Sequence, residues 1–245
     1  MNKKICVLSL SGGMDSTGLL LNLIKNEYTD LYILSFYYGQ KHNIELKRAK
    51  KNITYIKKKL PTLKIEHKLI DLSEIMGMFN SALTSKDIEV PEGHYSSETM
   101  KSTVVPNRNA IFSSLLFGYA LSISTKEKLP VDIALGVHGG DHAIYPDCRP
   151  EFYTSILKVF KEGNWESENV NFYLPFLNDD KFTILTDAYE SCKKLKLSFN
   201  RVFANTNTCY KPNEKGESCK KCGSCTERLE AFTKLGMADP VLYSI

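Results

Sequence analysis

Short apolar runs alternate along this chain with longer stretches in which apolar positions recur at helical spacing. The apolar runs predict strands at residues 4–10, 31–38, 64–70, 131–137 and 170–174. The amphipathic stretches predict helices at residues 16–25, 43–60, 109–124, 150–162 and 181–194. This alternation is typical of an α/β fold, a doubly wound parallel sheet of about five strands with right-handed crossovers.

Two segments interrupt the alternation. Residues 73–103 are polar, include Pro91 and Gly93, and are long for a plain connection, as lids and partly disordered loops often are. Residues 205–245 hold a cluster of cysteines followed by an expected helix and a short tail. We therefore expect a main α/β domain at residues 1–204 and a small C-terminal module at residues 205–245.

A glycine-rich loop joins the first expected strand to the first expected helix. Its residues are Leu10, Ser11, Gly12, Gly13, Met14, Asp15, Ser16 and Thr17. Glycines let backbone N–H groups approach an anion, and the helix N-terminus favours negative charge. Asp15 would cap the helix or hold a metal ion, and the hydroxyls of Ser16 and Thr17 add donors.

The order of residues in this loop separates it from two common nucleotide motifs. A Walker loop requires a lysine after its glycines, and the dinucleotide fingerprint requires G-x-G-x-x-G; this loop has neither. The simplest alternative is an ordinary Gly-Gly turn with a capping Asp. Both glycines, Asp15 and Ser16 in this order favour a phosphate site, in particular one for pyrophosphate.

Polar motifs also follow other expected strands, where ligands of open α/β sheets bind. Tyr38 to His42 follow the second strand, His138 to Arg149 follow the fourth, and Asn107 to Asn109 precede a helix. The candidate ligand-contacting residues are Tyr38, Gln40, His42, Asn107, Arg108, Asn109, His138, Asp141, Tyr145, Asp147 and Arg149.

The side chains in these motifs suit a carboxylated or phosphorylated ligand. Arg108 can clamp a carboxylate or phosphate with two parallel hydrogen bonds, while Asn107 or Asn109 caps the following helix. Asp141 and Asp147 can accept hydrogen bonds from a guanine-like N–H edge or bind magnesium through water. The alternative is a solvated loop with incidental charges.

Four of the seven cysteines are clustered: Cys209, Cys219, Cys222 and Cys225. Four thiolates satisfy tetrahedral zinc and leave no position for water, so this spacing predicts one structural zinc ion. An iron–sulfur cluster and free thiols are the alternatives. The remaining cysteines are scattered, and Cys148 is expected to be a packed side chain rather than a nucleophile.

Composition narrows the class of protein further. The chain is 42% hydrophobic and 24% charged, and it contains no apolar run long enough for a transmembrane helix. Its first residues lead directly into a strand without a signal sequence, so we expect a cytoplasmic protein that does not associate with membranes. The net charge of +4 is mild, and the lysines of residues 47–64 lie on an amphipathic helix, so we expect no nucleic-acid binding.

These motifs together resemble the 7-cyano-7-deazaguanine synthase family of the ATP-pyrophosphatase (PP-loop) superfamily. The resemblance rests on residues 10–17, 36–42, 105–109, 136–152 and 208–210 and on the cysteine module with Glu227 and Arg228. It extends over nearly the whole chain. The segment YPDCR at residues 145–149 and the cysteine spacing are its most specific parts.

The resemblance implies an adenine-nucleotide α-hydrolase-like sheet and a carbon–nitrogen ligase, working as a homodimer. Its substrates would be 7-carboxy-7-deazaguanine, ATP with Mg²⁺, and ammonia, and its product the nitrile precursor of queuosine. The implied catalytic residues are Asp15, Ser16, Arg108 and Arg149, with the backbone of residues 11–16 stabilising the departing pyrophosphate. Asp141, Tyr145 and Asp147 would read the deazaguanine ring.

Three other functions are compatible with the same loop. The activated acid could be transferred to an amine on another protein, or the chain could modify tRNA, although its modest charge argues against RNA binding. A nucleotide-sensing module without turnover is the third. The ammonia source is not visible in the sequence.

Overall fold

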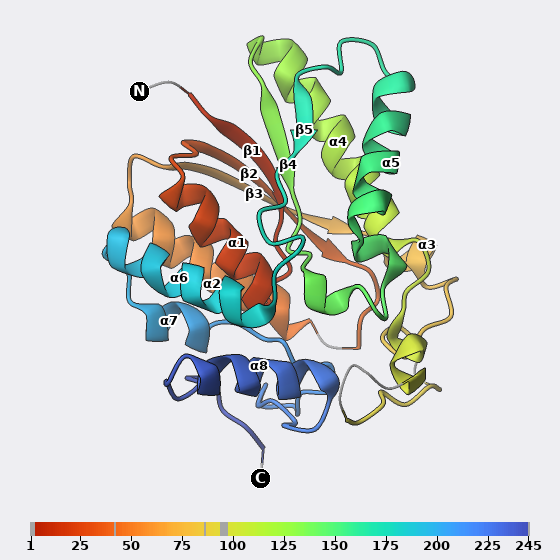
Figure 1. The fold of residues 1–245 in the computed structure, drawn as a ribbon, viewed down its shortest axis with the longest axis vertical. Coiled ribbons are helices and arrows are strands. Elements are labelled where there is room, and N and C mark those ends of the chain that lie inside the picture. Colours follow the sequence, from red (N-terminus) through yellow and green to blue (C-terminus); the bar gives the residue numbers. More distant parts are fainter. Residues whose placement is uncertain (1–2, 42, 86, 94–97, 245) are drawn as a thin grey trace.

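Five parallel strands form a single sheet in the order β3-β2-β1-β4-β5 (Figure 1). The strands are β1 (Ile5–Ser9), β2 (Asp30–Tyr37), β3 (Lys64–Asp71), β4 (Val131–Ala134) and β5 (Val170–Phe172). The computed structural model describes residues 3–41, 43–85, 87–93 and 98–244. The central strand is β1, with β2 and β3 on one side of it and β4 and β5 on the other. The strand order therefore changes direction between β1 and β4, which is where ligands of such sheets bind.

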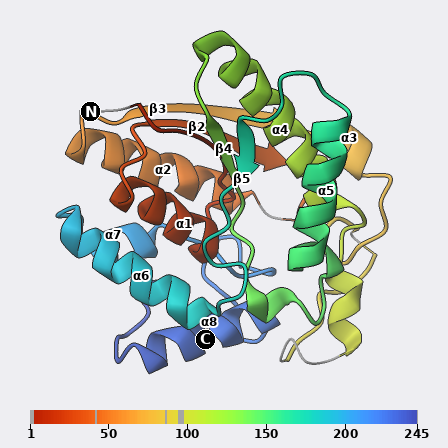
Figure 2. The same cartoon turned by 45° about the horizontal axis from the view of Figure 1, so that its top comes forward.

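Helices cover both faces of the sheet (Figure 1). On one face lie α1 (Met14–Lys25), α2 (Ile44–Lys59), α6 (Lys181–Lys194) and α7 (Phe199–Ala204). On the other lie α4 (Arg108–Glu127) and α5 (Pro150–Glu162). The short helix α3 (Ser73–Met76) follows β3, and α8 (Gly223–Lys234) lies next to α6 in both views (Figure 2).

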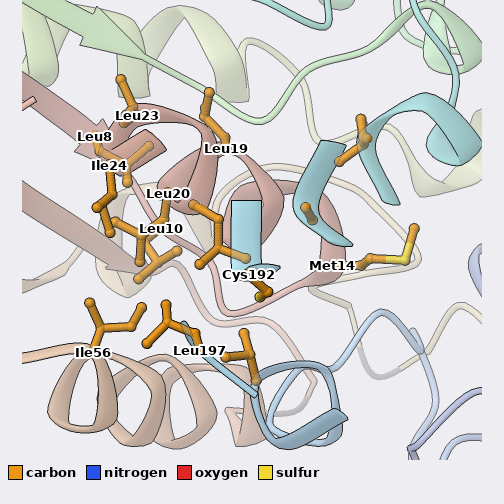
Figure 3. Close-up of a cluster of buried hydrophobic side chains, with 14 of the residues drawn as sticks. Leu8, Leu10, Met14, Leu19, Leu20, Leu23, Ile24, Ile56, Cys192 and Leu197 are labelled. Carbon is orange, nitrogen blue, oxygen red and sulfur yellow. The ribbon is translucent and has the colours of Figure 1, made fainter. Parts of the chain in front are cut away.

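Alternating side chains of the central strand enter two separate cores. Cys6 and Leu8 of β1 pack toward α1 and α6, whereas Ile5 and Val7 pack toward α4. Figure 3 shows the first core, in which leucines of β1 and α1 meet Ile56 of α2. Since both faces are covered, the inner strands β1, β2 and β4 are mostly apolar and buried, whereas the edge strand β3 alternates with polar residues and is largely unburied.

The predicted fold class is confirmed, and the observed strands and helices lie close to the residue ranges predicted for them. The largest shifts are of three residues: α4 ends at Glu127 rather than at residue 124, and β4 ends at Ala134 rather than at residue 137. The chain leaves the sheet there because Gly136 passes against the loop after β1. A Cβ at Gly136 would lie 2.8 Å from the backbone nitrogen of Ser16. Helix α7 was not predicted, since six residues are too few for a periodic pattern.

The described part of residues 73–103 is tied to the body of the protein. The backbone nitrogen of Lys41 donates to the carbonyl of Leu83, and Val90 packs against Cys209 and Cys222. The backbone nitrogen of Gly93 donates to the carbonyl of Lys221. The polar composition of this segment gave no sign of these contacts.

The C-terminal segment shares the core of the main sheet. Phe232 of α8 belongs to the same apolar cluster as Phe203 of α7 and Leu185 of α6. The expected division into a domain at residues 1–204 and a module at residues 205–245 therefore remains a prediction, since side chains from both parts pack in one core. Within the described ranges, no helix is both long and apolar enough to cross a membrane.

Candidate functional site

A cavity opens at the carboxyl ends of the strands, where the sequence placed the polar motifs. Its walls include Ser9 at the end of β1, Phe36 near the end of β2 and Val137 after β4. The predicted site residues that line it are Ser11, Gly13, Asp15, Ser16, Tyr38, Gln40, Arg108, Asn109 and Asp141. Residues from four separate segments of the chain are thus brought to one cavity.

The glycine loop is held in an anion-binding shape. Gly12 has φ 92°, and a Cβ there would lie 2.1 Å from the carbonyl oxygen of Glu45, so only glycine fits. The backbone nitrogen of Gly13 donates to Ser11 Oγ at 3.1 Å, and Ser11 Oγ lies 3.0 Å from Ser16 Oγ. This leaves the first turn of α1 facing the cavity, as phosphate binding requires.

Asp15 does not cap α1, which corrects one of its two predicted roles. The N-cap is Gly13, and no side chain accepts a hydrogen bond there. Asp15 Oδ1 is buried and has no hydrogen-bond partner among the described residues. An unpartnered carboxylate oxygen beside a phosphate-binding loop fits a magnesium ligand. Leu10 and Met14, by contrast, are buried in the core beneath the loop, and Thr17 is buried as well.

A buried lysine that the sequence did not single out faces the same loop. Lys181 begins α6, lines the cavity, and places Nζ 3.9 Å from Asp15 Oδ2. Its Nζ also lies 2.5 Å from Glu227 Oε2 and 3.1 Å from His138 Nε2. Burial alone would lower the pKa of Lys181, but Asp15, Asp141 and Glu227 outweigh it and hold the pKa well above its usual range.

Arg108, at the start of α4, supplies a second cation to the cavity lining. Burial would lower its pKa, but Tyr38, Tyr145 and Asp147 outweigh burial and raise the pKa, so the guanidinium stays charged. Asn107 is the N-cap of α4 in the left-handed conformation at φ 60° and is exposed, away from the cavity lining.

An apolar wall lies beside this guanidinium. The rings of Phe36 and Phe112 stack with centroids 4.2 Å apart and line the cavity together with Leu83. Gln40 accepts from the backbone nitrogen of Tyr38 at 2.8 Å and so fixes the turn after β2. His42 lies outside the described residues. Flat apolar side chains next to a fixed cation suit an aromatic ring that carries a carboxylate.

The motif at residues 138–149 is only partly at the cavity. Asp141 lines it, and His138 is 1% exposed with Nε2 3.4 Å from Asp141 Oδ2. Tyr145 instead bonds Thr103 Oγ1 through its hydroxyl at 2.6 Å. Arg149 Nε donates to the carbonyl of His142 at 2.9 Å, outside the cavity lining.

Asp147 supports the cavity wall from outside the lining, and the neighbouring Cys148 is part of the lining. Asp147 Oδ2 accepts from the backbone nitrogen of Asn109 at 3.3 Å, so its carboxylate fixes the start of α4. The Cys148 thiol is 2% exposed, and burial raises its pKa above the usual range. This environment agrees with the expected packed cysteine and opposes a nucleophilic thiolate.

Glu45 and Asn207 also line the cavity, and the sequence did not identify either as a site residue. Glu45 lies in the first turn of α2, where its Oε1 accepts from Asn207 Nδ2 at 3.4 Å. Burial raises the pKa of Glu45 to about 7, outweighing the Asn207 hydrogen bond and the charges of Arg108 and Arg48. A residue in an amphipathic helix carries no sequence signal for such a role.

The raised pKa of Glu45 predicts a pH-dependent stability. Its contribution to folding is fully present below the ordinary value of 4.5 and is lost as the pH rises through about 7. We expect Glu45→Gln to match the wild type in stability near pH 4.5 and to exceed it by on the order of 3 kcal/mol at pH 8. Chemical denaturation at both pH values measures this; a difference independent of pH would contradict it.

The four predicted cysteine ligands converge in the C-terminal segment. The sulfur atoms of Cys209, Cys219, Cys222 and Cys225 lie within 4.8 Å of one another. The backbone nitrogens of Lys211 and Cys219 donate to Cys209 Sγ at 3.3 and 3.2 Å. Converging sulfurs that accept backbone hydrogen bonds suit thiolate ligands, so this cluster is compatible with a closed, structural zinc site.

A parallel sheet with a strand–glycine loop–helix at its carboxyl edge and a four-cysteine cluster nearby defines an α/β protein of the PP-loop type. The model of the family described as "Queuosine biosynthesis protein QueC" matches residues 5–236. The chain therefore belongs to the QueC family of queuosine biosynthesis proteins.

Curated relatives cover nearly the whole chain. The 7-cyano-7-deazaguanine synthase 2 of Colwellia psychrerythraea is 44% identical over 244 residues, covering 99% of this chain and 100% of that protein. The 7-cyano-7-deazaguanine synthase of a Marinomonas species is 45% identical, with 99% of each chain covered. Among solved structures, NMN synthetase from Francisella tularensis is 15% identical with a TM-score of 0.40, covering 96% of this chain and 79% of that one. The names of the curated relatives are those of an enzyme.

Proposed function

We propose that this protein converts 7-carboxy-7-deazaguanine, ATP and ammonia into 7-cyano-7-deazaguanine, AMP and pyrophosphate. The observation that carries the proposal is one cavity lined by two chemically different groups of residues. The glycine loop, Asp15 and Lys181 form the group that we call the phosphate-binding end, and Arg108, Phe36 and Phe112 form a group that suits an aromatic acid. The names of near full-length relatives support the same reaction.

The reaction requires the carboxylate to be activated, because its oxygen is a poor leaving group. A carboxylate oxygen attacks the α-phosphorus of ATP, the α–β bridging bond breaks, and pyrophosphate leaves. Ammonia then attacks the acyl carbon, AMP departs with the oxygen, and an amide forms after loss of a proton. A second ATP activates the amide oxygen in the same way, and loss of AMP and two protons gives the nitrile.

The residues of the cavity have distinct parts in this proposal. Backbone N–H groups of the loop would stabilise charge on the departing pyrophosphate, assisted by Lys181. Mg²⁺ would be held at Asp15 and would neutralise phosphate charge. Arg108 would orient the substrate carboxylate, a part that we assign to it rather than to Arg149, whose guanidinium bonds the carbonyl of His142.

A single reaction mixture tests the proposal. Purified protein with ATP, Mg²⁺, ammonia and 7-carboxy-7-deazaguanine should give the nitrile by mass spectrometry, with about two AMP per nitrile. Omitting ammonia should stop nitrile formation while leaving pyrophosphate release from the first activation detectable. Absence of nitrile with ammonia as the sole nucleophile would refute the proposal and favour transfer to another amine.

A further inference from the structure

We infer that Glu227 is a positioning residue for the phosphate-binding end of the cavity, acting through Lys181. The cysteine module would then complete the site as well as stabilise the chain. This inference rests on the proposed function in one respect, namely that Lys181 faces the phosphate groups of a bound nucleotide.

Lys181 forms ion pairs with two carboxylates from different segments of the chain. Its Nζ is 2.5 Å from Glu227 Oε2 on α8 and 3.9 Å from Asp15 Oδ2 in the glycine loop. Lys181 is 7% exposed, and a buried ammonium on a flexible four-carbon stem needs a partner that fixes its position. Lys181 and Asp15 line the cavity, whereas Glu227 contacts Lys181 from outside the lining.

Glu227 decides how strongly Lys181 is drawn toward Asp15. With Glu227 present, the ammonium has its short contact away from the loop, and Asp15 keeps one buried oxygen without a partner. Without this carboxylate, the ammonium would move toward Asp15 and compete with a metal ion for it. The chemistry at the loop therefore depends on a residue from the C-terminal segment.

The cysteine module fixes Glu227 in place. Cys222 is the N-cap of α8 and Cys225 lies in its first turn, so two residues of the sulfur cluster precede Glu227 on the same helix. The next residue, Arg228, is 1% exposed and bonds Asp239 through Nε and Nη2 at 2.7 and 2.9 Å. Because the residues before and after Glu227 are held rigidly, the backbone position from which its carboxylate extends is fixed.

Gly140 makes room for this arrangement. A Cβ at Gly140 would lie 3.1 Å from the ring of His138 and 4.0 Å from Glu227 Oε1. Without a side chain at this position, His138 and Glu227 approach Lys181 from adjacent directions. Gly140 thus serves the packing around Lys181.

A simpler interpretation is that the Lys181–Glu227 ion pair only attaches α8 to α6. Calorimetry on the zinc-loaded full chain distinguishes this structural role from the positioning role, by measuring the binding of inorganic pyrophosphate with Mg²⁺. Glu227→Gln keeps the shape of the side chain and should weaken pyrophosphate binding about tenfold, equivalent to ~1.4 kcal/mol. The exposed Glu230 on the same helix gives the matched control Glu230→Gln, which should bind as the wild type does.

A double-mutant cycle identifies the route of the effect. If Glu227 acts through Lys181, Glu227→Gln should have no further effect on pyrophosphate affinity in a Lys181→Ala background. Zinc content and melting temperature of Glu227→Gln should stay at the wild-type values. Three results would each overturn the inference. Glu227→Gln could bind pyrophosphate with wild-type affinity, or it could lose the same affinity in the wild-type and Lys181→Ala backgrounds. The third is that the wild type does not bind pyrophosphate. Pyrophosphate binding needs neither the acid nor ammonia, so its outcome is independent of the nitrile assay.

Discussion

Asp15→Ala is expected to lower pyrophosphate release by at least about 100-fold while leaving the fold and the zinc content unchanged. Asp15 lies in the first turn of α1, at the phosphate-binding end of the cavity. Its Oδ1 atom is buried and has no hydrogen-bond partner in the part of the chain that the structure describes, which is the arrangement expected of a group reserved for a ligand or ion. Removing it takes away the carboxylate that would hold Mg²⁺.

The folded state should tolerate this substitution well. Lys181, the cation nearest to Asp15, keeps its short contact with Glu227 on α8, so no buried charge is left without a partner. The cysteine cluster belongs to a different segment of the chain and does not include Asp15.

Steady-state pyrophosphate release, circular dichroism and zinc analysis together check this prediction. Asp15→Asn keeps the side-chain shape and removes the charge, and it should be nearly as inactive. Glu190→Ala removes an exposed carboxylate from α6 and should be fully active. Full activity of Asp15→Ala would refute the part assigned to Asp15.

Cys222→Ser is expected to remove the zinc ion and to lower the free energy of unfolding by on the order of 3–5 kcal/mol. Structural zinc in isolated fingers contributes more, roughly 10–16 kcal/mol, because nothing else holds them folded. Here Phe232 of α8 still packs in the main core. Loss of the cluster should nevertheless loosen Val90, which packs on the cysteines, and the chain from Cys209 back to Asn207.

The same variant should therefore lose activity as well as stability. The backbone nitrogen of Asn207 donates to the carbonyl of Gly12 at 2.9 Å, so the segment before Cys209 supports the glycine loop directly. Metal analysis, denaturant unfolding and the nitrile assay measure the three effects. Cys192→Ser, which removes a buried thiol outside the cluster, should retain one zinc per chain. One zinc ion bound to Cys222→Ser, or bound iron in the wild type, would contradict the zinc assignment.

Much of the fold was predictable because both faces of the sheet are buried. Strands such as β2, with seven consecutive buried residues, are mostly apolar and stand out from the amphipathic helices. The glycine loop was predictable for a similar local reason. Gly12 has a positive φ, and the carbonyl oxygen of Glu45 lies where a side chain at this position would be. Only glycine meets both conditions, so the requirement is visible in the sequence. The four cysteines were equally visible, since their spacing is itself the signal.

The members of the cavity that the sequence did not reveal are ordinary residues within ordinary elements. Lys181 and Glu227 are 46 positions apart and belong to different helices, and nothing in either helix predicts that they touch. Conversely, Tyr145 and Arg149 stand in the most distinctive motif of the chain, yet their side chains bond Thr103 and the carbonyl of His142. A motif shows that a segment is constrained, but it does not show which way each side chain points.

The sequence by itself determined the alternating α/β architecture, the glycine loop between the first strand and helix, the cysteine cluster and the family, because each is encoded in residues close together along the chain. Only the tertiary structure decided which charges meet. Packing α8 against α6 brings Glu227 to Lys181, and folding α2 beside the loop brings Glu45 into the cavity. Burial and charge pairing depend on neighbours from distant segments, so Lys181 and Glu45 acquire their properties only in the folded protein.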